Sequence, residues 1–150
     1  MKRRLMNRDF EKCLKNKRIV LQEHADKLID AELETAKEDL EETRLSIKQS
    51  RYKWATIQGY YSMFHSARAL LFAKGYREKS HVCLKYAIQA LYVEERILDK
   101  KYVEQFDVTM LLRETADYKR EFSKESAETA LKNAEEFMAE TERILTLGSI

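Results

Sequence analysis

The fold of this chain is decided by residues 50–75, SRYKWATIQGYYSMFHSARALLFAKG. Large apolar side chains recur there at three- and four-residue steps, and a second apolar arc lies beside the first. The stretch opens with Ser50, a residue type that caps helix starts, and closes with Gly75, which suits the left-handed position after a helix end. The pattern therefore predicts a helix that is apolar around most of its circumference and is buried at the centre of the domain. Its apolar positions are Trp54, Ile57, Tyr61, Phe64, Leu71 and Phe72, with Tyr60, Met63, Ala67 and Leu70 alongside.

Further helical patterns lie on both sides of this central helix. Residues 6–17 predict a short charged helix, and residues 24–49 predict a long helix with one apolar face. A helix follows Ser80, another covers residues 102–118, and Ser123 caps a last helix with a clear apolar seam. We see no strand pattern. Because long helices joined by short connections pack as antiparallel neighbours, the sequence predicts an all-α, up-and-down antiparallel helical bundle. It has four long helices plus short N-terminal and connecting helices, in a single domain over residues 1–150.

The composition narrows the class of protein further. The chain has 150 residues, enough for one core, and its three Gly and absence of Pro disfavour a turn-rich β-sandwich. Its net charge of +2 neither indicates nor excludes nucleic acid as a partner. Cys13 and Cys83 lack metal or redox spacing, so we expect free thiols in a reducing compartment. The basic first residues lack the apolar run of a signal peptide, and no stretch is apolar enough to cross a bilayer. We therefore expect a cytoplasmic protein without membrane contact.

The common catalytic and cofactor motifs are absent from the sequence. The three glycines are isolated, so there is no Gly-rich phosphate loop. There is also no HExxH motif, no Cys/His cluster and no Glu-x-x-His pair of the di-iron type. We expect no metal and no cofactor, and the sequence disfavours an ordinary metalloenzyme or hydrolase.

Two pairs of polar residues stand out near the central helix. His65 and Arg68 lie three residues apart on one face of it. They either pair structurally with neighbouring carboxylates, which we favour, or line a pocket or dimer interface that binds a ligand. Arg77 and His81 flank the turn that follows. With Lys79 and the start of the next helix they could bind a phosphate, although a solvated loop is the safer interpretation.

A third set of polar residues lies on the helix over residues 102–118. Arg113 and Asp117 are four residues apart, which by spacing alone indicates a surface ion pair worth about 0.3–0.5 kcal/mol. Tyr118 follows directly.

Together these strings resemble a prokaryotic branch of the HEPN family. The likeness rests on YYSMFHSARALL over residues 60–71, on Ser80-His81, and on Arg113 followed by the ADY string at residues 116–118. It extends from about residue 5 to residue 145. The resemblance implies a helical bundle that forms a homodimer and is often encoded beside a minimal nucleotidyltransferase in toxin–antitoxin-like modules. Active HEPN proteins are metal-independent ribonucleases, whose motif is an Arg followed four to six residues later by a His, joined across the dimer.

The sequence departs from that motif in one respect. Arg113 matches the family Arg, but Asp117 and Tyr118 stand where the His is expected. RNA cleavage without metal needs a group that exchanges protons near neutral pH, and a carboxylate held beside a guanidinium is a poor proton donor.

Three hypotheses follow from this departure. We favour a dimeric protein that binds a nucleotide, RNA or a nucleotidyltransferase partner without efficient cleavage, with His65, Arg68, Arg77 and His81 as ligand-binding candidates. The second hypothesis is a ribonuclease with a variant catalytic site of Arg113, Asp117 and Tyr118, helped by His65. The third is a non-catalytic interaction module whose polar helix residues are all structural.

Overall fold

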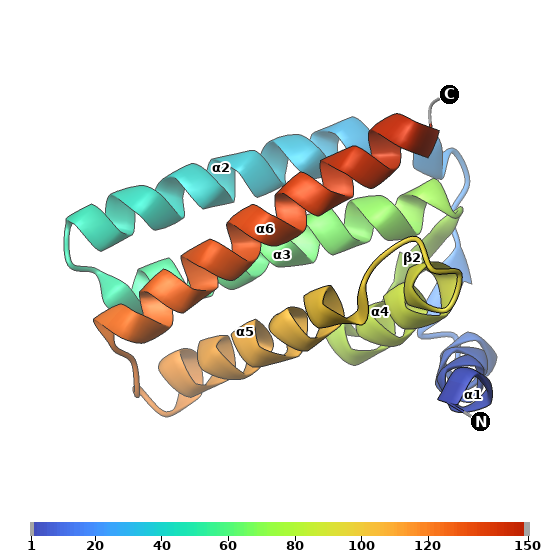
Figure 1. Cartoon of the computed structure of the whole chain (residues 1–150), viewed down its shortest axis with the longest axis horizontal. Helices are drawn as coiled ribbons and strands as arrows, with labels where there is room; N and C mark the ends of the chain where they lie inside the picture. Colours follow the sequence, from blue (N-terminus) through green and yellow to red (C-terminus); the bar gives the residue numbers. More distant parts are fainter. Residues whose placement is uncertain (1, 149–150) are drawn as a thin grey trace.

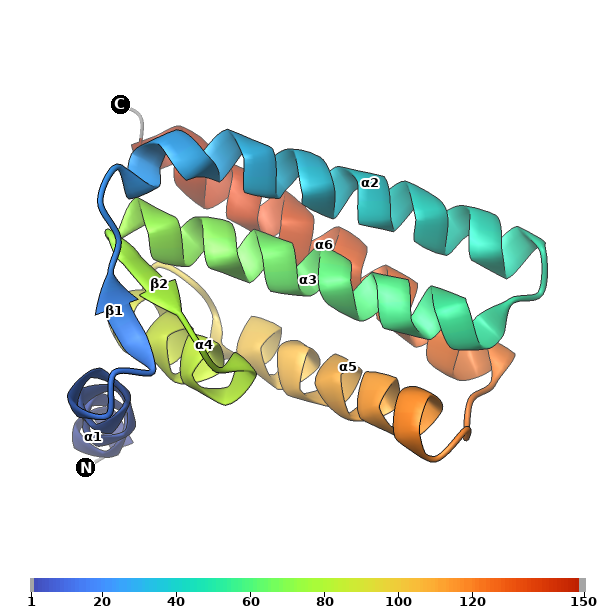
Figure 2. The same cartoon turned by 180° about the vertical axis from the view of Figure 1, so that it is seen from behind.

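The computed structural model describes residues 2–148 as a bundle of four long helices (Figure 1). Consecutive long helices run in opposite directions, as Figure 2 shows from behind. This arrangement confirms the predicted all-α, up-and-down bundle. The long helices are α2 (Ile29–Lys48), α3 (Tyr52–Ala73), α5 (Lys100–Tyr118) and α6 (Lys124–Gly148). The short elements are α1 (Lys2–Lys15), β1 (Ile19–Leu21), the 3₁₀ helix η1 (Ala25–Leu28), β2 (Tyr76–Glu78), α4 (His81–Ile88) and the π-helical turn η2 (Gln89–Val93).

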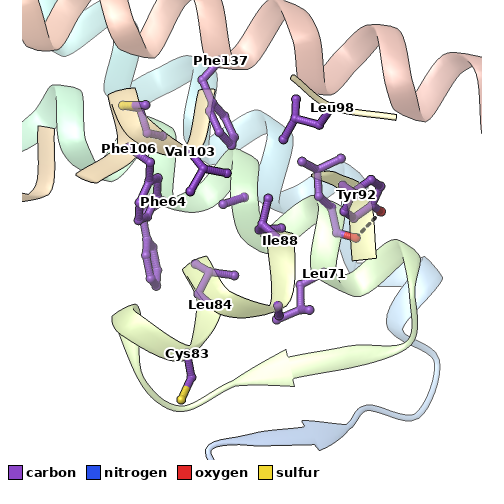
Figure 3. Packing of buried hydrophobic residues seen from close by; sticks show 14 of the residues in the cluster. Phe64, Leu71, Cys83, Leu84, Ile88, Tyr92, Leu98, Val103, Phe106 and Phe137 are labelled. Atoms are coloured by element: carbon purple, nitrogen blue, oxygen red, sulfur yellow. Dashed lines mark hydrogen bonds between the residues drawn. The ribbon is translucent and has the colours of Figure 1, made fainter. Parts of the chain in front are cut away.

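The central helix α3 packs most extensively against α2 and α6. It supplies a large share of the core, including Met63, Leu70 and Leu71, which are fully buried. Gly59 lets α6 approach closely, since a Cβ built there would lie 3.0 Å from the Cβ of Ala130. Figure 3 shows aromatic and aliphatic side chains of α3, α4, η2, α5 and α6 that pack together in the core. The prediction of a buried central helix is therefore confirmed.

The start of α3 differs from the prediction in two details. Ser50 does not cap the helix; it adopts a left-handed φ of 59° in the turn after α2, and Arg51 is the N-cap residue. Trp54 is 53% exposed, because the buried side of the first turns runs through the small residues Ala55 and Gly59. At the other end, Gly75 has a φ of +83°, the left-handed conformation that was predicted.

The other predicted helices and caps agree with the structure. Residues 6–17, 24–49 and 102–118 correspond to α1, to η1 with α2, and to α5. Ser80 Oγ accepts a hydrogen bond from the backbone N–H of Cys83 at the start of α4. Ser123 Oγ accepts one from the N–H of Ser126, at 3.0 Å, at the start of α6.

The expectation of no strands is wrong, because β1 and β2 form an antiparallel pair. Ile19 pairs with Glu78, Val20 with Arg77 and Leu21 with Tyr76. Strands of three residues are too short to show a period of two, so the sequence gives no signal for them. They meet because the hairpin of α2 and α3 brings residue 76 back beside residue 21 (Figure 2).

The expectation of free thiols is also wrong. Cys13 of α1 and Cys83 of α4 form a disulfide, with their Cα atoms 5.8 Å apart. The two residues are separated by 70 positions in the sequence. They meet because the β1–β2 pair and the packing of α1 on α4 bring the two helices together. The spacing of the two cysteines in the sequence gives no indication of that packing.

Within residues 2–148 no helix has both the length and the apolar character required to cross a membrane.

Candidate functional site

The polar candidates lie along one face of α3. Figure 2 shows this helix in front, with α2 on one side and β2, α4 and α5 on the other. Side chains from all of these elements reach α3. Glu32 comes from α2, Glu78 from β2, His81 from α4 and Arg113 from α5. The face therefore collects residues from five elements into two neighbouring groups.

The first group, here named the Arg68 network, consists of Arg68, His65, Glu32 and Glu78. Arg68 donates to both carboxylate oxygens of Glu78, from Nε at 2.9 Å and from Nη2 at 2.8 Å. Its Nη1 lies 3.4 Å from Glu32 Oε1, and His65 Nδ1 lies 2.6 Å from Glu32 Oε2. All three guanidinium nitrogens are thus directed at carboxylates. These contacts agree with the structural interpretation of His65 and Arg68.

Charges within the Arg68 network compensate for its partial burial. Burial raises the pKa of Glu32, but the hydrogen bond of His65 and the charge of Arg68 outweigh it and hold this pKa below its usual value. Burial likewise opposes the charge of Arg68, yet the Glu78 carboxylate raises the pKa of this guanidinium. The side chain of Glu78 is only 5% exposed. The network is therefore an internal ion cluster that joins α2, α3 and β2.

The second group, here named the Arg113 cluster, consists of Arg113, Tyr60, Tyr61, His81, Asp117 and Tyr118. Arg113 Nη2 donates to Tyr61 Oη at 3.0 Å and lies 3.6 Å from Asp117 Oδ2. The guanidinium carbon is between 5.4 and 5.8 Å from the ring centres of Tyr60, Tyr61 and Tyr118. Its Nε is buried without a hydrogen-bond partner among the described residues. Arg113 therefore has an N–H group without a described acceptor, whereas all three guanidinium nitrogens of Arg68 are directed at carboxylates.

His81 belongs to the Arg113 cluster although it comes from another helix. It is the first residue of α4, and its ring stacks on Phe64 with the centres 4.4 Å apart. Its Nδ1 lies 2.6 Å from Tyr60 Oη. Burial and the charge of Arg113 lower the pKa of His81, against the opposite effect of Glu78. Because burial also raises the pKa of the Tyr60 phenol, this pair is a neutral imidazole and a protonated tyrosine at neutral pH.

Phe64 connects the two groups. Its ring stacks on His81 and lies 4.5 Å from the guanidinium carbon of Arg68. Its centre is also 5.4 Å from that of His65. Phe64 is 4% exposed, so it forms a buried apolar partition between the Arg68 network and the Arg113 cluster.

The remaining predicted site residues differ in their surroundings. Asp117 is partly exposed beside Arg113, and Tyr118 is 73% exposed at the edge of the same cluster. Arg77 is exposed on β2 opposite Val20 and has no described contact with either group. Among the described residues, no three His, Cys, Asp or Glu side chains come close enough together to hold a metal ion.

Sequence reasoning missed five residues that build the two groups. Tyr60, Tyr61 and Phe64 are in the YYSMF string, but periodicity assigned them only to the core. Glu32 is one of many acidic residues on α2, and Glu78 lies in a segment expected to be a loop. The three aromatic residues could have been identified because they lie close to His65 on the same helix. No local sequence pattern distinguishes the two carboxylates from other acidic residues.

Comparisons with known proteins identify the kind of fold that carries this site. The family model described as HEPN domain matches residues 29–144. "Putative toxin MJ0605" of Methanocaldococcus jannaschii is 30% identical over 118 residues, which cover 78% of this chain and 88% of that protein. "Putative toxin MJ0142" of the same organism is 29% identical over 120 residues, covering 79% and 82%.

Two further comparisons agree. A UPF0332 protein of Thermotoga maritima is 27% identical over 122 residues, which cover 80% of this chain and 92% of that protein. The crystal structure of TT1696 from Thermus thermophilus superposes with a TM-score of 0.68 and 21% identity, covering 78% of this chain and 98% of that one. At that identity, the superposition supports the fold alone.

Proposed function

The chain belongs to the HEPN domain family, and from this premise we propose that it is a toxin-like protein that binds RNA, or a nucleotide, at the Arg113 cluster. The two toxin-named relatives support the first part of the proposal. The state of Arg113 supports the second. Its guanidinium contacts Tyr61 and, at 3.6 Å, Asp117, without a bidentate carboxylate partner among the described residues, and it lies beside the exposed ring of Tyr118.

The chemistry of the cluster suits a single-stranded nucleotide. An arginine fork with spare N–H groups binds a phosphate through two parallel hydrogen bonds. Aromatic rings next to it offer stacking surfaces, each worth about 1–3 kcal/mol per base. Tyr61 holds the guanidinium in place, whereas Tyr118 is open to a base. The Arg68 network has no such capacity, since its guanidinium nitrogens are directed at carboxylates.

RNA binding is tested by fluorescence anisotropy with a short labelled single-stranded RNA. We expect Arg113→Ala to weaken binding by about tenfold or more, because a charge-assisted contact contributes about 1.5–3 kcal/mol. Arg77→Ala is the matched control, since it removes an exposed arginine outside both groups. Equal affinities of the wild type and Arg113→Ala would refute the proposal.

We also propose that the protein acts as a homodimer through the outer face of α5. Val108 and Leu111 lie three residues apart on one face of the helix and are 48% and 64% exposed. Exposed apolar residues gathered on one helix face are typical of interaction surfaces. Light scattering should give twice the chain mass, and Leu111→Asp should reduce it to the monomer mass. A monomeric wild type would contradict this part of the proposal.

A second candidate function, metal-independent RNA cleavage, is favoured by the position of His81. The family His is absent after Arg113, but His81 reaches the same cluster from α4. With Nδ1–H donating to Tyr60, Nε2 could take the proton of a ribose 2′-hydroxyl. The 2′-oxygen then attacks phosphorus, the bond to the 5′-oxygen breaks and that oxygen takes a proton from a water molecule, while Arg113 stabilises the negative charge. His65 is less suited, because Glu32 and Asp39 flank its ring.

Cleavage is tested with RNA in EDTA at pH 6–8. If the protein is a nuclease, His81→Ala and Arg113→Ala abolish cleavage and His65→Ala retains it. Intact RNA in all reactions, together with binding that depends on Arg113, would mean that the protein binds RNA without cleaving it. Were Arg113→Ala and His65→Ala to change the melting temperature without any change in binding, the chain would be an interaction module.

The family resemblance also leads us to propose a minimal nucleotidyltransferase as partner, which co-purification from the native organism would test.

A further inference from the structure

We propose that the Cys13–Cys83 disulfide holds an N-terminal arm, defined as residues 2–21, against the bundle under redox control. Reduction of the disulfide releases the arm and loosens β2 and the start of α4. The proposal rests on the contacts of the arm and not on RNA binding. The arm lies outside the HEPN match at residues 29–144, whereas Cys83, β2 and the start of α4 lie within it.

The arm is attached at one end of the bundle. Figures 1 and 2 both show α1 beyond the ends of the long helices, next to α4. Its helix packs on α4 and η2, and its strand pairs with β2. Among residues 8–15 only Phe10 and Cys13 are buried, so a single turn of α1 provides the anchorage. The four long helices make most of the contacts of the bundle with one another.

The non-covalent attachment of the arm rests on a few side chains. Phe10 and Ile19 belong to the hydrophobic core, Leu14 packs against it, and Ile19 is 1% exposed. Phe10 meets the ring of Tyr76 edge-on at 5.8 Å. The strands are three residues long, supplemented by hydrogen bonds from Lys79 N to Arg18 O and from Gln22 N to Gly75 O. A two-stranded pair of this size is marginal by itself in water. The disulfide, which closes a loop across 70 positions, adds a covalent restraint to these contacts.

The disulfide and the arm restrain two segments that carry site residues, namely β2 and the start of α4. Glu78, which holds Arg68 with both carboxylate oxygens, is in β2 and pairs with Ile19 of the arm. Cys83 is in the first turn of α4, two residues after His81, and its N–H donates to the Ser80 cap. Figure 3 shows the Cys83 sulfur turned away from Leu84 and Ile88 of the core. Release of the arm removes the strand partner of Glu78 and a covalent restraint on the turn that holds His81.

The redox step requires an external dithiol. One of its thiolates attacks a sulfur of the pair, which breaks the S–S bond and forms a mixed disulfide. The second thiolate then attacks the mixed disulfide, so the dithiol leaves as its own disulfide after giving up two electrons. Cys13 and Cys83 each gain a proton and become thiols. Since the two residues are only 5% and 9% exposed, this exchange proceeds through a transient opening of α1.

The test is hydrogen–deuterium exchange of the full chain, with and without dithiothreitol, read by mass spectrometry. We expect reduction to speed exchange in residues 8–21 and 76–83 at least about tenfold more than in the middle of α6. Cys13→Ser is the matched control. It should show the fast exchange in both conditions and no response to dithiothreitol.

Two outcomes would overturn the proposal. A uniform rise in exchange across all helices would mean that the disulfide stabilises the whole bundle and fastens no separate arm. Equal protection of residues 8–21 before and after complete reduction, with both thiols verified by alkylation, would mean that the disulfide does not control the arm. Because neither result depends on RNA, failure here is distinct from failure of the proposed function.

Discussion

Arg68 and Arg113 are both held against α3, but their neighbours give them different chemistry. Arg68 faces two carboxylates, one of them in a bidentate contact. Arg113 faces three tyrosine rings and has only one ion-pair partner among the described residues, 3.6 Å away. Removal of the partners of Arg68 should therefore affect stability, and removal of Arg113 should affect binding.

Glu78 is the main partner of Arg68. Glu78→Gln leaves a largely buried guanidinium without its bidentate carboxylate, and we expect the free energy of unfolding to fall by about 3 kcal/mol or more in urea denaturation. Glu41→Gln is the control, because Glu41 pairs with Arg44 on the exposed surface. The control should change stability by less than about 1 kcal/mol. An effect of Glu78→Gln as small as that of the control would show that the network contributes little.

The stability of the protein should depend on the protonation of His81. The charged groups that face this imidazole are Arg113 and Glu114 of α5, Arg68 of α3 and Glu78 of β2, beside the Tyr60 phenol. Because the folded state lowers the pKa of His81, the unfolded chain binds a proton at higher pH than the folded chain does.

Stability contributed by neutral His81 is therefore present above pH 6.5 and is lost as the pH falls from that value through the folded pKa. We expect the free energy of unfolding to decline between pH 7 and pH 5, and the decline to be shallower in His81→Asn. The measurement is urea denaturation at half-unit pH steps. Parallel curves for the two proteins would contradict the assignment.

The sequence was informative about residue types at the site and uninformative about their partners. Arg113, Asp117 and Tyr118 share one helix, so their neighbourhood followed from spacing alone. That His81 joins them depends on the packing of α4 against α3, which no local pattern encodes. Ion pairing of Arg68 was predictable from its place on an apolar helix, but the choice of Glu78 was not.

At the scale of elements, the contact between α3 and α6 depends on a small residue. We predict that Gly59→Ala destabilises the protein by about 1–3 kcal/mol, because the new Cβ lies 3.0–3.3 Å from Cβ, C and O of Ala130. This cost exceeds the gain of up to about 1 kcal/mol in helix propensity. Thermal unfolding measures the difference.

A matched control for that prediction is available in the same helix pair. Ala130→Gly removes one of the crowded atoms, so Gly59→Ala should cost less when it is made in that background. Equal costs in both backgrounds would show that the two residues do not interact.

Helices were predictable from sequence and strands were not. Ser80 and Ser123 mark helix starts through side-chain caps, and the apolar seam of α6 is regular along the helix. In contrast, Ile19–Leu21 finds its partner at Tyr76–Glu78, far along the chain. A pairing so distant depends on the α2–α3 hairpin and is invisible to periodicity. Trp54 shows the opposite error, since its spacing fitted a seam that smaller residues occupy.

For the whole molecule, we predict that removal of the disulfide lowers stability. Closure of a loop across 70 positions constrains the unfolded chain. In the chain-entropy model this contributes on the order of 4 kcal/mol, and measured values are typically about 2–4 kcal/mol. Urea denaturation of Cys83→Ser against the oxidised wild type should show a loss in this range, and reduction of the wild type should reproduce it. An unchanged denaturation midpoint would contradict the prediction.

The arrangement of the bundle could be predicted, whereas its covalent cross-link could not. Short connections between long helices leave few ways to pack them, and antiparallel order follows. The disulfide depends on where α1 lies against α4, and that position is set by the side chain of Phe10 and a three-residue strand. Two cysteines without characteristic spacing gave no reason to expect it.

The exposure of Trp54 has a consequence for spectroscopy. It is the single tryptophan of the chain, and water surrounds about half of its indole in the folded state. Its emission should therefore change little in wavelength when the chain unfolds, so circular dichroism is the better monitor of denaturation. A blue shift in the native protein would instead report that another molecule has covered the start of α3. This natural fluorophore is thus a label-free sensor of association.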